Sequence, residues 1–381
     1  FVRTKSYPGP GRGAPGVKPD ATRFGRSAER KQKRKVQRMF PLIRIPAGYS
    51  RHERKRKEPP MTEAAKTVLT AYEVRKTKQQ KEAFRTFLCE ELEKLGYAPR
   101  VESGRSLVTS HNVVAGDPEK AKVLFTAHYD TCAVLPFPNF ITPRNFFVYL
   151  LYQLAIAALF LVLAIVVEVC LLLAFDPPLW VQLPVVYAVL AFCIWWILAG
   201  KANRHTANDN TSGVVTLLEI AAALPTELRD TVCFVWFDNE EAGLFGSSAF
   251  TAAHRRVKAD TLVLNFDCVG DGDHLQLFPG RTVKKETDTL SLLEESFPSE
   301  GKKAVEVVRG FGFYPSDQAR FRRGVGIAAL KKAPVIGYYM DRIHTRRDTV
   351  LEEENVALLC RGAVRLAGTL TEQKDGLHHA G

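Results

Sequence analysis

The sequence lacks any arrangement of cysteines that would support a disulfide framework. Its seven cysteines are odd in number and scattered, and no two of them have Cys-X-X-Cys spacing. They are Cys89, Cys132, Cys170, Cys193, Cys233, Cys268 and Cys360. Unpaired thiols are typical of proteins in a reducing compartment. We therefore expect free thiols and a folded body that faces the cytosol.

The chain beyond residue 60 lacks a net positive charge, although the whole chain has a formal net charge of +12. Residues 1–60 hold 18 of the 53 Lys and Arg residues but only 4 of the 41 acidic residues. The near-neutral remainder argues against a nucleic-acid partner. Because residues 1–60 are rich in Pro, Gly and Arg, we expect a disordered basic arm, or sequence upstream of a functional start at Met61. No apolar segment follows these charges, so no secretory signal is predicted.

Two long segments lack charge almost completely. Residues 146–175 contain one charged side chain, Glu168, and residues 179–199 contain none. Twenty-one helical residues span about 31 Å, enough to cross a bilayer core. The residues between the segments, Asp176-Pro177-Pro178, allow only a tight reversal. We predict a transmembrane helical hairpin within 136–200 that contacts the lipid bilayer through 146–199; two buried core helices are the alternative.

The flanks of the hairpin predict its orientation. Arg144 precedes the first segment, Lys201 and Arg204 follow the second, and the connecting turn carries only Asp176. Positively charged flanks favour the cytoplasmic side of a membrane. We therefore expect an integral membrane protein whose folded domain, outside the hairpin, faces the cytoplasm.

The remaining segments alternate between buried strands and helices. Strand patterns occupy 122–130, 231–238 and 261–267, and helical patterns occupy 62–97, 211–224, 244–256 and 354–370. Such alternation predicts a layered α/β domain. We expect one domain in two parts, 61–135 and 201–372, separated by the hairpin and followed by a tail at 373–381.

Acidic and histidine residues stand at or near the ends of the expected strands. They are His128, Asp130, Asp209, Glu240, Glu241 and Asp267, and His344 follows later in the chain. The carboxyl ends of parallel strands are where ligands bind in α/β sheets. Imidazole and carboxylate groups are ligands for zinc and similar divalent ions. A pair of such ions needs one carboxylate that bridges them.

Five short motifs in this order resemble the co-catalytic di-zinc aminopeptidase family, metallopeptidase family twenty-eight, which includes glutamate carboxypeptidase and the transferrin receptor ectodomain. The motifs are HYD at 128–130, NDN-SG at 208–213, NEEAGLFGS at 239–247, NFD at 265–267 and HT at 344–345. The resemblance covers roughly 62–135 and 200–370. It implies a three-layer α/β/α zinc exopeptidase fold with a mixed, mostly parallel sheet, and a zinc-dependent aminopeptidase acting on peptides.

The resemblance also implies a role for each residue and two Zn²⁺ ions per chain. His128 and Asp267 would hold one ion, Glu241 and His344 the other, and Asp209 would bridge them. Asp130 would accept the other N–H of the His128 imidazole. Glu240 would be the general base on a bridging water and would return the proton to the leaving amine. A cis peptide is expected at Asp209-Asn210.

The sequence departs from the family pattern in three places. Ile343 stands where a tyrosine often stabilises the oxyanion, with Tyr338 and Tyr339 as possible substitutes, and Gln318 replaces a histidine in a pocket-lining segment. The third departure is the hairpin itself, which lies between His128 and Asp209. Its linkers are short, so the site should sit close to the bilayer surface.

Ordinary structural interpretations exist for each motif alone. His128 and Asp130 could be a strand-end pair, Asp209 a helix N-cap, Asp267 a loop acid, and the two glutamates a solvated helix start. Alternatives for the whole chain are a glutaminyl cyclase with one zinc, a carboxypeptidase, or a non-catalytic membrane scaffold. All five ligands and the base are present in order, which favours the aminopeptidase. No sequence feature fixes an oligomeric state.

Overall fold

The computed structural model describes residues 61–378, so the expected basic arm at 1–60 lies outside the described residues. The chain divides into two units, Phe1–Pro59 and Pro60–Gly381, and all described elements belong to the second. The closing helix is longer than the pattern at 354–370 indicates, because α10 runs over Glu353–His378.

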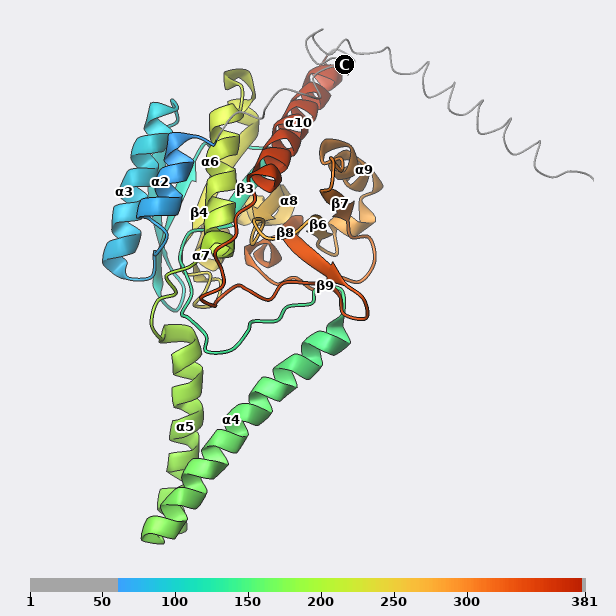
Figure 1. The fold of residues 1–381 in the computed structure, drawn as a ribbon. Helices are drawn as coiled ribbons and strands as arrows, with labels where there is room; N and C mark the ends of the chain where they lie inside the picture. The colour runs from blue at the N-terminus through green and yellow to red at the C-terminus, as the bar shows by residue number, and fades with distance from the viewer. Residues whose placement is uncertain (1–60, 379–381) are drawn as a thin grey trace, which may run out of the picture. The chain divides into compact units, whose positions relative to one another are not determined.

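A nine-stranded mixed sheet forms the centre of the domain (Figure 1). Its order is β1-β2-β4-β3-β5-β8-β6-β7, and β9 pairs with β8. The strands are β1 (Pro99–Arg105), β2 (Thr109–Ala115), β3 (Val123–His128), β4 (Val232–Phe237), β5 (Leu262–Phe266), β6 (His274–Pro279), β7 (Ala304–Val307), β8 (Gly324–Ala333) and β9 (Gly337–Tyr339).

The middle of the sheet is parallel, which brings several carboxyl ends to one edge. Strand β3 pairs in parallel with β4 and β5, and β5 pairs in parallel with β8. His128 at the end of β3 lies opposite Phe237 at the end of β4. All residues of β3, β4 and β5 are buried, as expected for strands covered on both faces.

Helices cover both faces of the sheet, which confirms the expected three-layer α/β/α architecture. One core contains side chains of α2 (Glu63–Ala71), α3 (Lys78–Lys94), α6 (Gly213–Ala223), α9 (Thr287–Ser296) and α10. The other core contains side chains of α7 (Phe245–Ala253) and α8 (Arg255–Asp260). Helix α3 shows why such helices form here: Thr77 and Gln80 make a capping box, and Phe84, Leu88 and Leu92 recur every fourth residue on its buried face.

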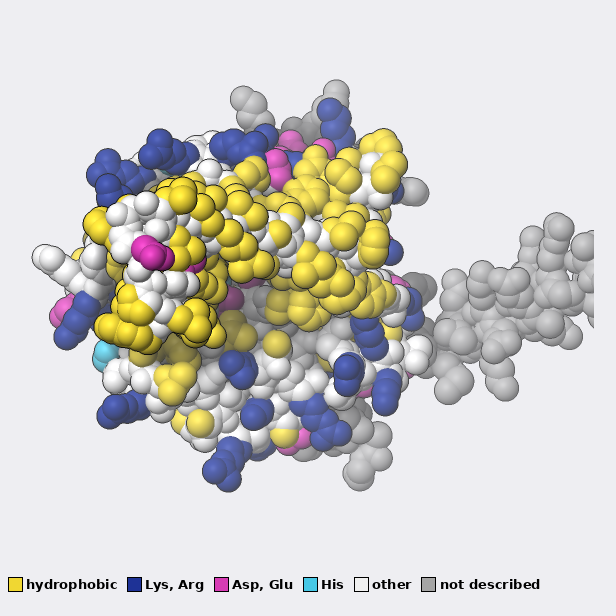
Figure 2. All heavy atoms as spheres, turned by 90° about the horizontal axis from the view of Figure 1, so that it is seen from below, with side chains coloured by type: hydrophobic (Ala, Val, Ile, Leu, Met, Phe, Trp, Pro, Cys, Tyr) yellow, Lys and Arg dark blue, Asp and Glu magenta, His cyan; other side chains and the backbone are white. Residues whose placement is uncertain are grey.

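The two apolar segments are helices with the expected bounds, α4 (Phe146–Phe175) and α5 (Leu179–Ala199), and they extend away from the domain (Figure 1). Only 6% of the most apolar window in each helix is buried. The alternative of two buried core helices is therefore wrong. Figure 2, seen from the hairpin end, shows hydrophobic side chains covering both helices and Lys and Arg side chains spread over the domain around them.

The chain leaves the domain and returns to it at neighbouring points. Ala133 and Ala202 form an antiparallel bridge, and the Val134 N–H donates to the Lys201 carbonyl at 2.9 Å. Asn145 caps the start of α4 by accepting the Val148 N–H, and Asp176 ends the helix in the left-handed conformation at φ 42°. The hairpin is thus inserted in the loop between β3 and α6, beside the carboxyl edge of the sheet.

Candidate metal centre

The structure brings together every residue that the motifs single out. Four of these side chains stand at or just after the ends of three adjacent strands: His128 at the end of β3, Glu240 and Glu241 after β4, and Asp267 after β5. Asp209 lies in the turn Ala207–Ser212 that precedes α6, at a kink where the backbone angles of Asp209 and Asn210 are not helical. His344 arrives from the loop after β9 with φ 58°, one of the few left-handed residues that are not glycine.

Asp209 lies between His128 and His344, and each of its two carboxylate oxygens faces one of these imidazoles. The Nε2 atom of His128 lies 3.4 Å from Asp209 Oδ1 and 3.6 Å from Asp267 Oδ1. The Nε2 atom of His344 lies 2.9 Å from Asp209 Oδ2 and 3.4 Å from Glu241 Oε2. We call His128, Asp209 and Asp267 the first donor set, and Glu241, His344 and Asp209 the second.

Main-chain hydrogen bonds fix the position of Asp209. The Asp348 carboxylate accepts from the N–H groups of Asn208 and Asp209 at 2.7 and 3.0 Å. The Asp209-Asn210 peptide is cis, which confirms the prediction. Gly213 lies so close to β5 that a Cβ atom there would stand 2.2 Å from the Phe266 carbonyl oxygen. The glycine of the NDN-SG motif therefore lets α6 approach the strand end.

Two asparagines of the same motif tie this turn to the loop after β5. Asn210 Oδ1 accepts from Gly213 N and Cys268 N at 3.0 and 3.2 Å. Asn208 Oδ1 accepts from Gly270 N at 2.6 Å. These bonds hold Asp209 and Asp267 in one rigid arrangement.

Asp130 contacts the glutamate loop as well as His128. Its two carboxylate oxygens accept the main-chain N–H groups of Glu240 and Glu241 at 2.9 and 3.2 Å. The Nδ1 atom of His128 lies 3.1 Å from the Asp130 carbonyl and 3.6 Å from its carboxylate. The resemblance implies that the Asp130 carboxylate is the partner of this imidazole, but the imidazole lies closer to the Asp130 main-chain carbonyl. Asp130 positions both glutamates, which the sequence does not reveal.

The site is rich in buried acidic side chains, and their burial and mutual charges shift the pKa values of the groups in it. Burial raises the pKa of Glu240 well above its usual range, and it raises the pKa of Glu241 to about 8. Burial lowers the pKa of His344, but the carboxylates of Glu241 and Asp209 outweigh it and bring the value to about 9. The pKa of Asp209 is lowered despite its burial, because both imidazoles stabilise the anion.

Three further buried groups surround the site without belonging to a predicted ligand motif. Burial raises the pKa of Asp348 to about 8 and that of Asp317 to about 7. Arg75 is fully buried, and burial lowers its pKa to about 10 although Asp130 and other acids oppose this. Its guanidinium donates to the Tyr129 carbonyl and to Thr211 Oγ1. Asp317 lies beside Gln318 in the pocket-lining segment and Asp348 lies three residues after the HT motif, whereas Arg75 belongs to none of the motifs.

The residues present fit divalent metal ions. Glu241 Oε1 is buried and has no hydrogen-bond partner among the described residues, although a carboxylate oxygen in such a place needs a cation or a donor. The ligand atoms of His128, Asp209 and Asp267 all lie within 4.8 Å of one another. Imidazole nitrogen with carboxylate oxygen is a donor combination that zinc accepts.

The tyrosines considered as substitutes at the Ile343 position make other contacts. The Tyr338 ring lies near Arg144, Lys332 and His274, and the Tyr339 ring lies near Phe140. The Ile343 side chain itself is buried. The hydroxyl of another tyrosine, Tyr314, donates to the Asp267 carbonyl at 3.0 Å.

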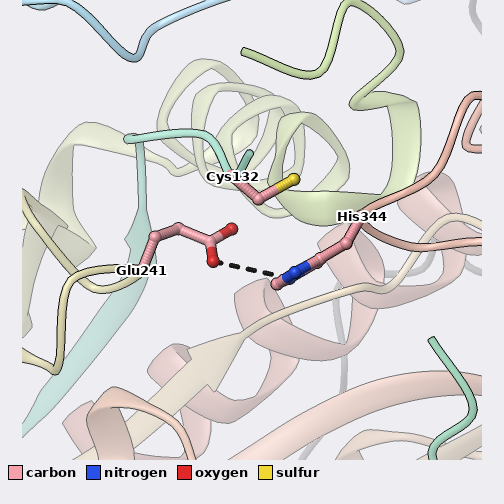
Figure 3. Close-up of side chains that lie close together, drawn as sticks. All are labelled: Cys132, Glu241 and His344. Carbon is pink, nitrogen blue, oxygen red and sulfur yellow. Dashed lines mark ion pairs between the residues drawn. The ribbon is translucent and has the colours of Figure 1, made fainter. Parts of the chain in front are cut away.

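Cys132 is a site residue that the motifs do not indicate. Figure 3 shows its sulfur beside Glu241 and His344, and the ligand atoms of the three residues lie within 4.8 Å of one another. Cys132 is only four residues after His128, which could have suggested that it lies near the site. The chain there enters the linker to the hairpin, however, and has no regular sequence pattern.

Comparisons with known proteins indicate a peptidase family for part of the chain. Residues 196–361 match the model of peptidase family M28. A probable leucine aminopeptidase of Arthroderma otae is 26% identical over 158 residues, covering 39% of this chain and 43% of that protein. A probable leucine aminopeptidase of Arthroderma benhamiae is 27% identical over 152 residues, covering 38% and 42%. The chain thus spans about two-fifths of the length of these curated relatives.

Two solved structures share the fold at low sequence identity. Glutaminyl cyclase of Porphyromonas gingivalis has a TM-score of 0.51 and 16% identity, covering 82% of this chain and 99% of that chain. A Zn-dependent exopeptidase of Parabacteroides distasonis has a TM-score of 0.50 and 15% identity, covering 81% and 98%. These likenesses establish the architecture.

Proposed function

We propose that this chain, whose residues 196–361 match the model of peptidase family M28, is a membrane-anchored metallo-exopeptidase that removes N-terminal residues from peptides with two zinc ions. The observation that carries the proposal is the pair of donor sets joined by Asp209. His128 and Asp267 would hold one ion, Glu241 and His344 the other, and Asp209 both. Bound zinc supplies a Lewis acid for the scissile carbonyl and lowers the pKa of a water molecule.

Glu240 is the residue that moves protons. A carboxylate oxygen of Glu240 lies within 4.8 Å of the ligand atoms of His128 and Glu241, yet neither donor set needs it. Burial raises its pKa well above that of an ordinary carboxyl, so this carboxyl holds a proton more readily. We assign it the proton of the attacking water and its delivery to the leaving amine.

The surrounding residues hold these groups in place. Asp130 fixes the main chain of Glu240 and Glu241, and Asp348 fixes that of Asp209. The cationic Arg75 lies behind Asp130 and Asp209 and offsets part of their charge. Such pre-positioned groups need little rearrangement during a reaction.

The hairpin supports a membrane location. Both helices are long and apolar enough to cross a bilayer. Trp180 stands at one end of α5, and Trp195 and Trp196 at the other, and all three are exposed. Tryptophans at both ends of a span are typical of membrane interfaces. With Arg144 and Lys201 at the domain end, we place the domain on the cytoplasmic side.

Hydrolysis of a peptide panel with counted zinc tests the proposal. The full chain in detergent should cleave peptides with a free N-terminus and leave their N-acetylated counterparts intact, with two zinc ions per chain. Cyclisation of N-terminal glutamine peptides with one zinc ion would instead support a glutaminyl cyclase. Zinc-loaded protein that turns over none of these peptides would contradict the exopeptidase proposal.

A further inference from the structure

The second donor set has a sulfur atom beside it. Cys132 lies in the loop that leads from β3 to the hairpin, Glu241 follows β4, and His344 follows β9. Three separate segments thus converge, and Figure 3 shows their side chains around one small space. Cys132 is 1% exposed, so its thiol faces this space rather than solvent.

An unpartnered oxygen points to a ligand in the same space. Glu241 Oε2 lies 3.4 Å from His344 Nε2, whereas Oε1 is buried and has no hydrogen-bond partner in the described part of the chain. A cation bound between them would satisfy the buried carboxylate oxygen, the thiol sulfur and the imidazole nitrogen together.

The main chain holds the sulfur at this place. The Cys132 carbonyl accepts the Asn203 N–H at 3.1 Å, and the Asn203 side chain donates to Cys132 Sγ at 3.9 Å and to the Thr345 carbonyl at 2.9 Å. Leu135 N donates to the His344 carbonyl at 2.7 Å. The two flanks of the hairpin therefore fix Cys132 and His344 relative to each other.

We propose that Cys132 is a sulfur ligand of the second metal ion, together with Glu241, His344 and Asp209. The inference rests on the proposed metal centre. When the metal binds, the thiol proton passes to solvent and the sulfur lone pair forms the bond to the metal. Four protein donors would then complete a tetrahedral zinc site, whereas the first donor set supplies three and leaves a position open. The two ions differ in role, and the thiolate selects zinc over manganese at the second.

Cobalt substitution tests the sulfur bond directly. Metal-free full chain in detergent is titrated with Co²⁺, and a thiolate ligand gives an intense near-ultraviolet charge-transfer band. We expect this band in the natural protein and its loss in Cys132→Ser, while the weaker visible bands of nitrogen- and oxygen-bound Co²⁺ persist. Cys233→Ser is the matched control, because Cys233 is equally buried but lies in β4 within a separate core. A band that survives in Cys132→Ser, or is absent from the natural protein, overturns the proposal.

Zinc X-ray absorption of the natural protein gives a second test that needs no variant. A sulfur shell at about 2.3 Å, averaging half a sulfur per zinc at two zinc ions per chain, is expected. Only nitrogen and oxygen scatterers would refute the sulfur ligand. Two zinc ions without sulfur, with peptide hydrolysis intact, would overturn this inference alone; failure to bind any metal would overturn the proposed function as well. Removing the donor should weaken the second zinc at least about tenfold, since loss of an outer-shell partner alone costs that much.

Discussion

The adjacent glutamates Glu240 and Glu241 allow the proposed division of labour to be tested with two isosteric substitutions. Glu240→Gln removes a proton acceptor but keeps the side-chain volume and the main-chain N–H that Asp130 accepts at 2.9 Å. The donor sets do not include Glu240, so both zinc ions should remain. General acid–base catalysis contributes about 10²–10⁴-fold, and we expect a loss of kcat in that range, about 3–5 kcal/mol.

Glu241→Gln is the matched control, one residue along the same loop. An amide is a poorer metal ligand than a carboxylate, and Oε2 of Glu241 faces His344. This variant should lose one zinc ion per chain, whereas Glu240→Gln should lose none. Plasma emission gives the zinc content, and release of a chromogenic amine from an aminoacyl substrate gives kcat. Unchanged turnover in Glu240→Gln, or zinc loss from that variant, would refute the assignment of the base.

Three other outcomes follow from the structure. Because the pKa of His344 is about 9 and that of Glu241 about 8 in the metal-free site, both hold protons at pH 7. Zinc binding should therefore release protons, and zinc affinity should rise between pH 7 and 9; calorimetry in two buffers of different ionisation enthalpy that finds no release would contradict this. Asp348→Asn loses one of the two hydrogen bonds that the Asp348 carboxylate accepts from the Asp209 turn and should weaken zinc binding about 10–100-fold, measured by competition with a chelator. Replacing 140–200 by a short loop should give a domain that stays in solution without detergent and still binds zinc. A folded domain that binds no zinc would show that the hairpin does more than anchor the domain.

The sequence predicts those parts of the fold in which local pattern and tertiary burial agree. Strands β3, β4 and β5 are covered on both faces, so their apolar runs are continuous and visible. The helices of the hairpin are equally clear, because each lies within a long apolar segment almost free of charge. Strand β1 is missed because it lies at the sheet edge with alternating partial exposure and contains a glycine and three charged residues. Strand β8 is missed although its first seven residues are buried, because Lys331 and Lys332 near its end interrupt the apolar pattern.

The candidate site divides in the same way. The motifs indicate His128, Asp209 and Asp267 because each follows a recognisable strand or precedes a helix. The sequence does not indicate a role for Asp348 in this way. Its partner Asp209 is 139 positions away, and only the folded chain shows that the Asp348 carboxylate accepts a hydrogen bond from the Asp209 main chain. Cys132 is hidden for a related reason, since the linker in which it lies acquires its course by pairing with residues beyond the hairpin.

The pairing of the two linkers explains how the hairpin can be inserted between two residues of the candidate metal site without separating them in space. The bridge between Ala133 and Ala202 closes the insertion at its base, so the separation of the two flanks does not depend on what lies between them. The closed base also carries the contacts to the His344 carbonyl and the Thr345 carbonyl. Replacing the two helices while keeping this bridge should therefore leave these contacts, and with them the second donor set, in place.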